Sequence, residues 1–231
     1  MKFVNNATSI LYLLRQTRIP ELEACCLDIA GINVLTRAVL EAAFVFAYLF
    51  DLPKADSERE FRGDAWMLHD LLARQRFGCP IGQFKAQLEK ERQKIEQLTA
   101  RLRGNFCFAS LSRNEQKAFM GGRKWRTMGW TQIGVEMGLD KNTASTFYSF
   151  LCSHAHAGYI SVLQVYQAKT EDQRRPLVSI QSGMLAIATA HMIAMFVRAV
   201  PHSLMEFNKV PKDVEFVNMW KYIGAAKLLG D

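Results

Sequence analysis

Several features that would assign a protein class at once are missing from this sequence of 231 residues. The five cysteines are odd in number and lack the spacing of a disulfide framework, which excludes a disulfide scaffold and favours a reducing compartment. No apolar run reaches the roughly 18 residues of a membrane span, and the N-terminal segment lacks a signal-peptide pattern. We therefore expect a cytoplasmic protein that does not enter a membrane.

Motifs for cofactors and metals are missing as well. The sequence contains no glycine-rich phosphate loop and no Cys-x-x-Cys pair. His154 and His156 are two residues apart, a spacing that suits a strand better than a helix, and no Asp or Glu lies nearby. The sequence therefore predicts no cofactor and no metal.

Acidic residues are scarce in one segment of the chain. From Lys85 to Arg126 there are 11 Lys and Arg against 4 Glu, a charge of +7 that equals the net charge of the whole chain. Such a local excess attracts polyanions such as nucleic acid, although a solvated helix face can have the same composition. Candidate phosphate contacts within it are Arg123, Lys124 and Arg126.

Hydrophobic periodicity predicts an all-α fold, a multi-helix bundle of roughly seven or eight helices. Two of these helices, at 21–51 and 177–200, are apolar on nearly every side and should be central. Residues 104–129 and 169–176 are expected to be irregular. We expect a single domain over 1–231, in which 83–129 forms a basic, protruding helix and loop. The charged helix at 83–103 is also a candidate surface for a homodimer.

Asn33, Arg37 and Glu41 are spaced four apart and form a polar stripe on an otherwise apolar helix. Charges on a buried helix need partners, and Arg37 and Glu41 can pair with each other. Alternatively, the stripe faces a site in which Arg37 binds an anion such as phosphate and Glu41 orients the bound group.

A second stripe has the same spacing: Tyr148, Cys152 and His156. Histidine titrates near neutral pH, so His156 can act as a general acid or base. His154 should point about 160° away from His156 on a helix, toward a neighbour or solvent. Cys152 has the reach of a nucleophile beside His156, but nothing in the sequence lowers its pKa, so buried packing is the default.

Residues 130–150 also match a helix-turn-helix mask, with small and apolar residues at the positions where two helices cross and turn. The mask uses Ile133, Gly134, Gly138 and Leu139, followed by Thr143, Ala144 and Ser145. On this interpretation Thr143 and Ser145 would face the groove of DNA, and Lys124 and Arg126 would hold phosphates.

Two short motifs carry a family resemblance. Arg37-Ala-Val-Leu-Glu41 resembles the R-x-x-x-E helix of a bacterial family of helical domains of unknown function. The segment from Tyr148 to His156, YSFLCSHAH, is similar to that family's Y-x-x-L-S-x-x-x-H helix, with Cys152 at the usual serine position. The family is distantly similar to the HEPN superfamily of helical bundles, although no Arg stands four to six residues before His154 or His156 as in the HEPN motif.

The resemblance implies a helical bundle with a polar pocket of Arg37, Glu41, Tyr148 and His156. It further implies a metal-independent ribonuclease with a role in phage defence or as a toxin, and RNA rather than DNA as the partner. A helix-turn-helix regulator that binds DNA and a non-catalytic interaction module are the alternatives.

Overall fold

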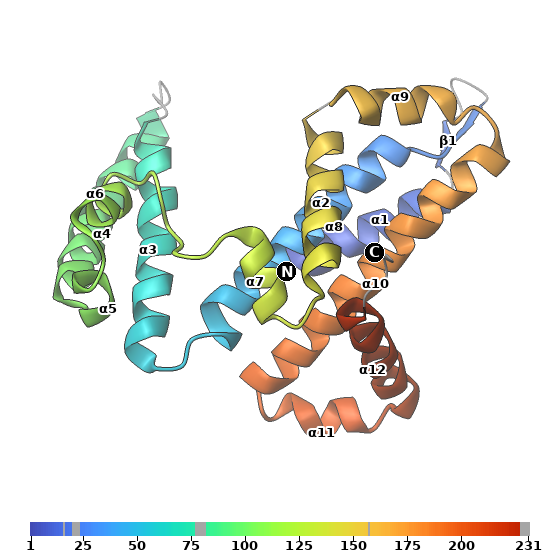
Figure 1. Ribbon diagram of the computed structural model, residues 1–231. Helices are drawn as coiled ribbons and strands as arrows, with labels where there is room; N and C mark the ends of the chain where they lie inside the picture. The colour runs from blue at the N-terminus through green and yellow to red at the C-terminus, as the bar shows by residue number, and fades with distance from the viewer. Residues whose placement is uncertain (16, 20–23, 77–81, 157, 227–231) are drawn as a thin grey trace. The chain divides into compact units, whose positions relative to one another are not determined.

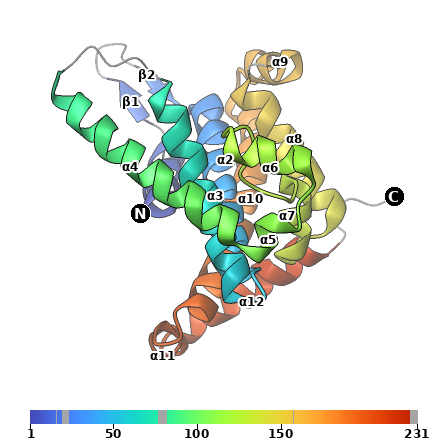
Figure 2. The ribbon, with the colours of Figure 1, turned by 90° about the vertical axis from the view of Figure 1, so that its left-hand side faces the viewer.

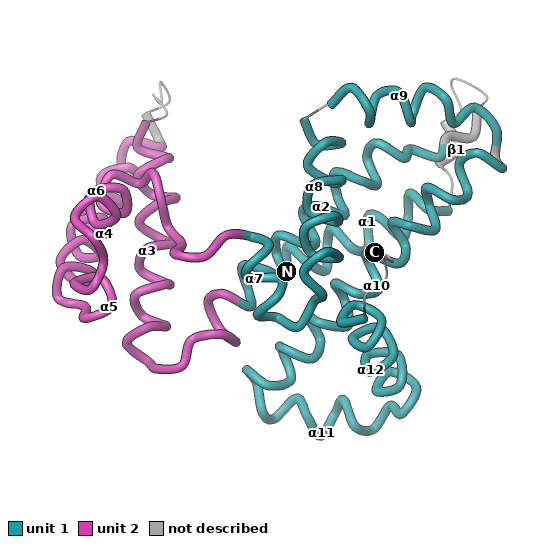
Figure 3. Tube along the Cα trace, viewed as in Figure 1, with its two compact units in different colours: residues 1–47, 130–231 teal, residues 48–129 magenta. Residues whose placement is uncertain are grey.

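Helices make up almost all of the described structure (Figure 1). The computed structural model describes residues 1–15, 17–19, 24–76, 82–156 and 158–226. The chain forms two compact units, unit 1 (residues 1–47 and 130–231) and unit 2 (residues 48–129), which are coloured separately in Figure 3. The predicted all-α bundle is confirmed. The single domain expected over 1–231 stays a prediction.

Among the described residues, ten elements belong to unit 1. They are α1 (Lys2–Leu14), β1 (Thr17–Ile19), β2 (Ala24–Cys26), α2 (Ile29–Phe46), α7 (Trp130–Glu136), α8 (Lys141–Ala155), α9 (Tyr159–Gln167), α10 (Glu171–Ala199), α11 (Ser203–Asn208) and α12 (Pro211–Ala225). The two strands pair antiparallel, with Arg18 opposite Cys25. Helix α2 packs against α1, α8 and α10, so it is the central element of this unit.

Two helical segments, Ile29–Asp51 and Asp172–Ala199, are long and apolar enough to cross a membrane by length and composition. Core helices of soluble proteins have the same character, and 44% of each apolar window is buried inside the protein. In unit 1, α2 and α10 pack on each other, as expected for the two central apolar helices. A cytoplasmic location stays a prediction.

Helices α7 and α8 form a helix-turn-helix pair. Gly134 allows their close approach, because a Cβ atom at this position would lie 3.1 Å from the Cβ of Ala144. The turn contains Gly138 with φ of 107°, a left-handed conformation that favours glycine. Asp140 then caps α8 by accepting hydrogen bonds from the backbone N–H groups of Asn142 and Thr143, both 3.0 Å.

Unit 2 contains η2, a π-helical turn that follows α2 in the chain, and four α-helices. They are η2 (Ala47–Asp51), α3 (Asp56–Gln75), α4 (Gly82–Gly104), α5 (Phe106–Ala109) and α6 (Arg113–Met120). Helix α4 packs along α3 (Figure 2), and the core between them includes Phe61, Leu68, Leu98 and Leu102. This separate core is the physical reason why 48–129 forms a unit of its own.

Capping residues explain where the structure departs from the expected helix boundaries. The helix expected over 21–51 begins at Ile29, because Asp28 caps it by accepting from the Gly31 N–H. Residues 104–129 are not wholly irregular, since a capping box of Ser112 and Glu115 starts α6. The expected loop at 169–176 largely belongs to α10, which a capping box of Thr170 and Gln173 begins.

Candidate functional site

The polar stripes of α2 and α8 face each other in unit 1. Helix α8 packs along α2, so the polar stripe of α2 meets polar side chains of α8 and of its C-cap. Asn33 contacts His154, Arg37 contacts His156, and Glu41 contacts Tyr148. The structure therefore brings Arg37, Glu41, Tyr148 and His156 together, although Arg37 and His156 are 119 positions apart in the chain.

Arg37 is the centre of this cluster. Its Nε donates to Glu41 Oε1 at 3.0 Å, and its Nη1 lies 3.1 Å from His156 Nε2. Burial works against the charge of Arg37, but the hydrogen bond and the charge of Glu41 outweigh burial and raise the arginine pKa. With 19% of the Arg37 side chain and 31% of the Glu41 side chain exposed, the pair is reachable from solvent.

Tyr148 covers the other side of the arginine. Its hydroxyl donates to Glu41 Oε1 at 3.4 Å, and the Arg37 guanidinium lies 5.8 Å from the centre of its ring. Burial, followed by a hydrogen bond with Cys152, raises the pKa of Tyr148 to about 12. The phenol is therefore protonated near neutral pH, and it can donate a hydrogen bond but cannot act as a base.

His156 stands just past the end of α8. The helix ends at Ala155, and His156 is its C-cap, with φ of −107° and a backbone N–H that donates to Cys152 O at 3.0 Å. A guanidinium only donates hydrogen bonds, so His156 Nε2 accepts from Arg37 and the ring proton is on Nδ1. The site thus presents an exposed imidazole with an unprotonated Nε2 beside a partly buried cation.

His154 also contacts the stripe of α2, contrary to the expectation that it points toward a neighbour or solvent. Because α8 ends between the two histidines, helical geometry does not govern their relative direction. His154 Nδ1 lies 3.3 Å from Asn33 Nδ2, and its Nε2 lies 3.2 Å from Gln164 Oε1. Burial lowers the pKa of His154, and the hydrogen bond with Gln164 opposes this effect in part.

The hydrogen bonds of Asn33 determine which nitrogen of His154 carries the proton. Asn33 Nδ2 donates to the Ile29 carbonyl at 3.0 Å, an acceptor that fixes the orientation of the amide. The same Nδ2 therefore donates to His154 Nδ1. The ring proton of His154 is then on Nε2, and this N–H donates to Gln164 Oε1. Gln181 of α10 donates to Asn33 Oδ1 at 2.8 Å. This chain of hydrogen bonds connects α2, α8, α9 and α10 beside the Arg37 cluster.

Sequence reasoning missed Gln164 and Gln181. Both lie on helices whose contacts with α8 and α2 depend on tertiary packing, and no local spacing links them to His154 or Asn33. His191 lies elsewhere in unit 1, buried next to Gly138 and Gly224. Cys152, a free thiol, takes part in the cluster through its hydrogen bond with Tyr148.

The residues proposed for DNA reading have different environments on α8. Thr143 is only 1% exposed, and its hydroxyl donates to Asp140 Oδ1 at 3.3 Å. Thr143 therefore lacks the exposed position that groove reading requires, because the N-cap of α8 holds it inward. Ser145 is exposed, and so are four other polar residues of α8: Lys141, Asn142, Thr146 and Ser149.

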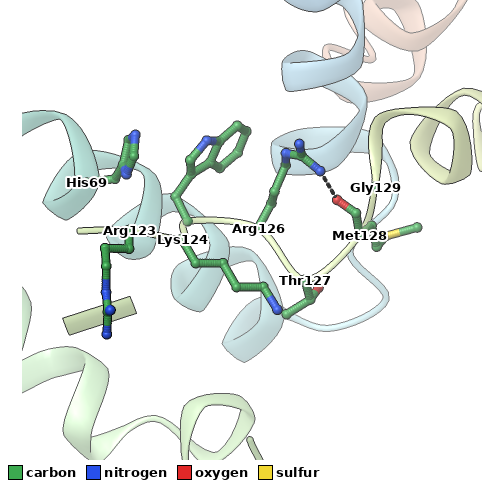
Figure 4. Close-up of a pocket in the computed structure, with 8 residues that line it drawn as sticks. His69, Arg123, Lys124, Arg126, Thr127, Met128 and Gly129 are labelled. Carbon is green, nitrogen blue, oxygen red and sulfur yellow. Dashed lines mark hydrogen bonds between the residues drawn. The ribbon is translucent and has the colours of Figure 1, made fainter. Parts of the chain in front are cut away.

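The three basic candidates lie in unit 2, on the loop after α6. Arg123, Lys124 and Arg126 line a cavity of about 380 Å³ together with His69 of α3 (Figure 4). Lys124 forms an ion pair with Glu115, and Arg126 donates to the Met128 carbonyl. This cavity, which lies in unit 2, is the second candidate site described for the chain.

No group of three or more His, Cys, Asp or Glu residues that could hold a metal ion occurs among the described residues. Comparisons with known proteins find no matching family model, no matching curated protein and no matching solved structure. The HEPN-like resemblance therefore rests on the two motifs alone, and function has to be argued from the geometry of the sites.

Proposed function

We propose that unit 1 acts on RNA, as a HEPN-like, metal-independent ribonuclease with a role in defence or as a toxin. The observation that supports this proposal best is the 3.1 Å contact between the Arg37 guanidinium and His156 Nε2. A cation for a phosphate and an unprotonated imidazole nitrogen for a proton are the two groups that cleavage by an internal 2′-hydroxyl requires.

The proposed reaction proceeds in one displacement at phosphorus. When Arg37 turns from His156 Nε2 to the phosphate, His156 Nε2 is free to take the proton of the ribose 2′-hydroxyl, and the 2′-oxygen forms a bond to phosphorus. The bond from phosphorus to the 5′-oxygen breaks, that oxygen takes a proton from water, and the resulting hydroxide takes the proton held by His156. Arg37 stabilises the charge on the phosphate oxygens. Glu41 orients the guanidinium through its hydrogen bond with Arg37, and the Tyr148 hydroxyl holds Glu41 in place through a second hydrogen bond. The products are a 2′,3′-cyclic phosphate and a 5′-hydroxyl.

Replacement of His156 by Ala tests this role. We expect the rate of RNA cleavage to fall by about 10²–10⁴-fold, the usual contribution of a general base, with the fold intact because His156 is exposed. His202→Ala is the matched control, since His202 is exposed on the same unit and outside the cluster. Equal cleavage by both variants would remove the proposal.

A second candidate function is DNA binding by the α7–α8 pair, and the exposed polar face of α8 favours it. This face consists of Lys141, Asn142, Ser145, Thr146 and Ser149. If it enters a groove, Ser145→Glu should abolish a salt-dependent gel shift of duplex DNA, because a carboxylate repels phosphates. Asn208→Glu, an exposed change of equal charge on α11, should leave the shift intact. Absence of both cleavage and DNA binding would favour an interaction module.

A further inference from the structure

The cavity of unit 2 is built almost entirely from one loop. Of its eight lining residues, seven are consecutive, from Arg123 to Gly129, and the eighth is His69 of α3. Its volume of about 380 Å³ is within the usual range of small-molecule sites, about 300–1,000 Å³. At the start of the loop, the aromatic residue Trp125 stands between basic residues, in the order Arg-Lys-Trp-Arg.

The beginning of this loop is fixed by the end of α6. The Arg123 N–H donates to Ala118 O at 2.9 Å and the Gly122 N–H donates to Phe119 O at 3.0 Å, the two bonds of a Schellman turn. Gly122 has φ of 63°, and a Cβ atom there would lie 3.0 Å from the Cβ of Leu72 on α3. The turn therefore requires glycine and places Gly122 against α3.

The middle of the loop is fixed by Tyr48. The Thr127 N–H donates to the Tyr48 hydroxyl at 3.1 Å, and the Trp125 ring meets the Tyr48 ring edge-on at 5.5 Å between centroids. Tyr48 is fully buried, with the Arg62 guanidinium 4.3 Å from its ring centroid. The loop is thus organised before any ligand binds, which reduces the entropy lost on binding.

The cavity has a net positive charge. The Arg123 side chain is exposed and forms no hydrogen bond or ion pair with the described residues, whereas the charge of Lys124 is balanced by Glu115. The hydrogen bond from Lys124, followed by that of Ser112, lowers the pKa of Glu115 and so keeps this partner charged. Unit 2 contains 16 Lys and Arg against 10 Asp and Glu, a charge of +6 that draws anions to it.

His69 adds an unusual polar group to the wall. Its Nδ1 is buried and has no hydrogen-bond partner among the residues that the structure describes. A buried polar atom without a partner is destabilising, and a ligand in the cavity that His69 lines can supply that partner.

We propose that this cavity binds the nucleoside monophosphate group of a nucleotide, whether free or at the phosphorylated end of a nucleic-acid strand. Arg123 binds the phosphate, with Lys124 and Arg126 beside it. His69 provides a hydrogen bond, and the half-buried indole of Trp125 offers a surface on which a base can stack. The site belongs to unit 2 and does not depend on the activity proposed for unit 1.

Calorimetric titration of the full chain with AMP and with adenosine tests the phosphate requirement. We expect AMP to bind and adenosine to bind at least about tenfold more weakly. A 5′-phosphorylated single-stranded oligonucleotide and its unphosphorylated counterpart identify the source. If AMP binds, a free nucleotide suffices, and if only the phosphorylated strand binds, the site takes strand ends. Equal binding with and without the phosphate, or no binding of either ligand pair, would overturn the proposal.

Four variants assign the binding to this cavity. Arg123→Gln should weaken binding of the phosphorylated ligand about tenfold or more, whereas Arg103→Gln, an exposed change of equal charge on α4, should not. His69→Phe retains a ring without the buried nitrogen and should also weaken binding. Unchanged binding in His69→Phe, or equal losses in the two arginine variants, would contradict the site. His156→Ala should leave nucleotide binding unchanged. The binding proposal and the ribonuclease proposal can therefore fail independently.

Discussion

At the scale of single residues, the two histidines at the end of α8 differ in the ring nitrogen that carries the proton. His156 accepts from Arg37 through Nε2, whereas His154 accepts from Asn33 through Nδ1. The first is thereby suited to take a proton from a substrate. The second is held neutral, because a proton on Nδ1 would face the N–H group of Asn33.

The two tautomers can be measured directly by long-range ¹H–¹⁵N NMR of the imidazole rings above pH 7. We expect the Nδ1–H form for His156 and the Nε2–H form for His154. In Arg37→Gln, a neutral amide replaces the fixed donor, so the preference of His156 should weaken while His154 is unchanged. The same tautomer on both rings in the unmodified protein would contradict the assigned hydrogen bonds.

Asn33 is the residue on which the chain of hydrogen bonds depends. Replacement by Leu leaves Gln181 Nε2 and His154 Nδ1 without partners, each at a penalty of about 1–3 kcal/mol. We expect the free energy of unfolding to fall by about 2–4 kcal/mol in a denaturant titration. Asn208→Leu, at an exposed position of α11, should change it by no more than about 0.5 kcal/mol.

At the scale of elements, the α7–α8 pair orients Tyr148 and the following residues against α2. The turn between these helices depends on Gly138, whose φ of 107° is strained for any side chain. The rest of the surroundings would accept a methyl group, since a Cβ atom would lie 3.5 Å from His191 Cε1, an ordinary contact. The cost of a substitution there is therefore mainly conformational.

Gly138→Ala should lower the melting temperature, with a loss of about 1–3 kcal/mol of stability. Gly183→Ala is a control of opposite sign, because Gly183 is inside α10 and a Cβ atom there meets nothing within 4 Å. Alanine at this helical position should stabilise the protein by about 0.4–1 kcal/mol. Stabilisation by both changes would show that the turn does not require a left-handed residue.

Much of the candidate site can be predicted from the sequence, because the stripes on α2 and α8 follow from spacing alone. Arg37 and Glu41 are one turn apart. Charged side chains on a buried helix need polar partners, and the stripe on α8 provides them. The end of α8 at Ala155 carries no signal in the hydrophobic pattern, so the position of His154 could not be predicted. The roles of Gln164 and Gln181 depend on how α9 and α10 pack, which no local pattern determines.

At the scale of the whole molecule, the chain separates a nearly neutral unit from a basic one. Unit 2 has a charge of +6 and unit 1 a charge of +1, from 13 Lys and Arg against 12 Asp and Glu. If unit 2 attracts nucleic acid and unit 1 acts on RNA, both binding and cleavage should weaken as salt rises, because phosphate contacts release counterions. On these proposals, the binding function and the chemical function lie in separate units.

The stability of the whole molecule should depend on pH through His191. Its pKa is lowered to about 4, first by burial and then by the charge of Lys221, against about 6.5 for an exposed histidine. Between these values the unfolded chain binds a proton that the folded chain does not, so stability is lost as pH falls from about 6.5 to about 4. The loss should be roughly 3 kcal/mol from this group.

Denaturant titrations between pH 7 and pH 4 measure this loss. The slope of unfolding free energy against pH should become flatter in His191→Gln, which cannot take up the proton. It should be unchanged in His202→Gln, because His202 is exposed. An identical slope in His191→Gln and the unmodified protein would assign the acid sensitivity to other groups.

The most direct test of the central claim, that Arg37 and His156 act together on RNA, uses an oligoribonucleotide in which single 2′-hydroxyls are replaced by hydrogen. The unmodified protein should leave a 2′,3′-cyclic phosphate at cleaved positions and spare each deoxy position, without added metal. Arg37→Gln and His156→Ala should each abolish the product, and the double variant should be no worse than either alone. Cleavage at the deoxy positions, or full activity in either variant, would contradict the account.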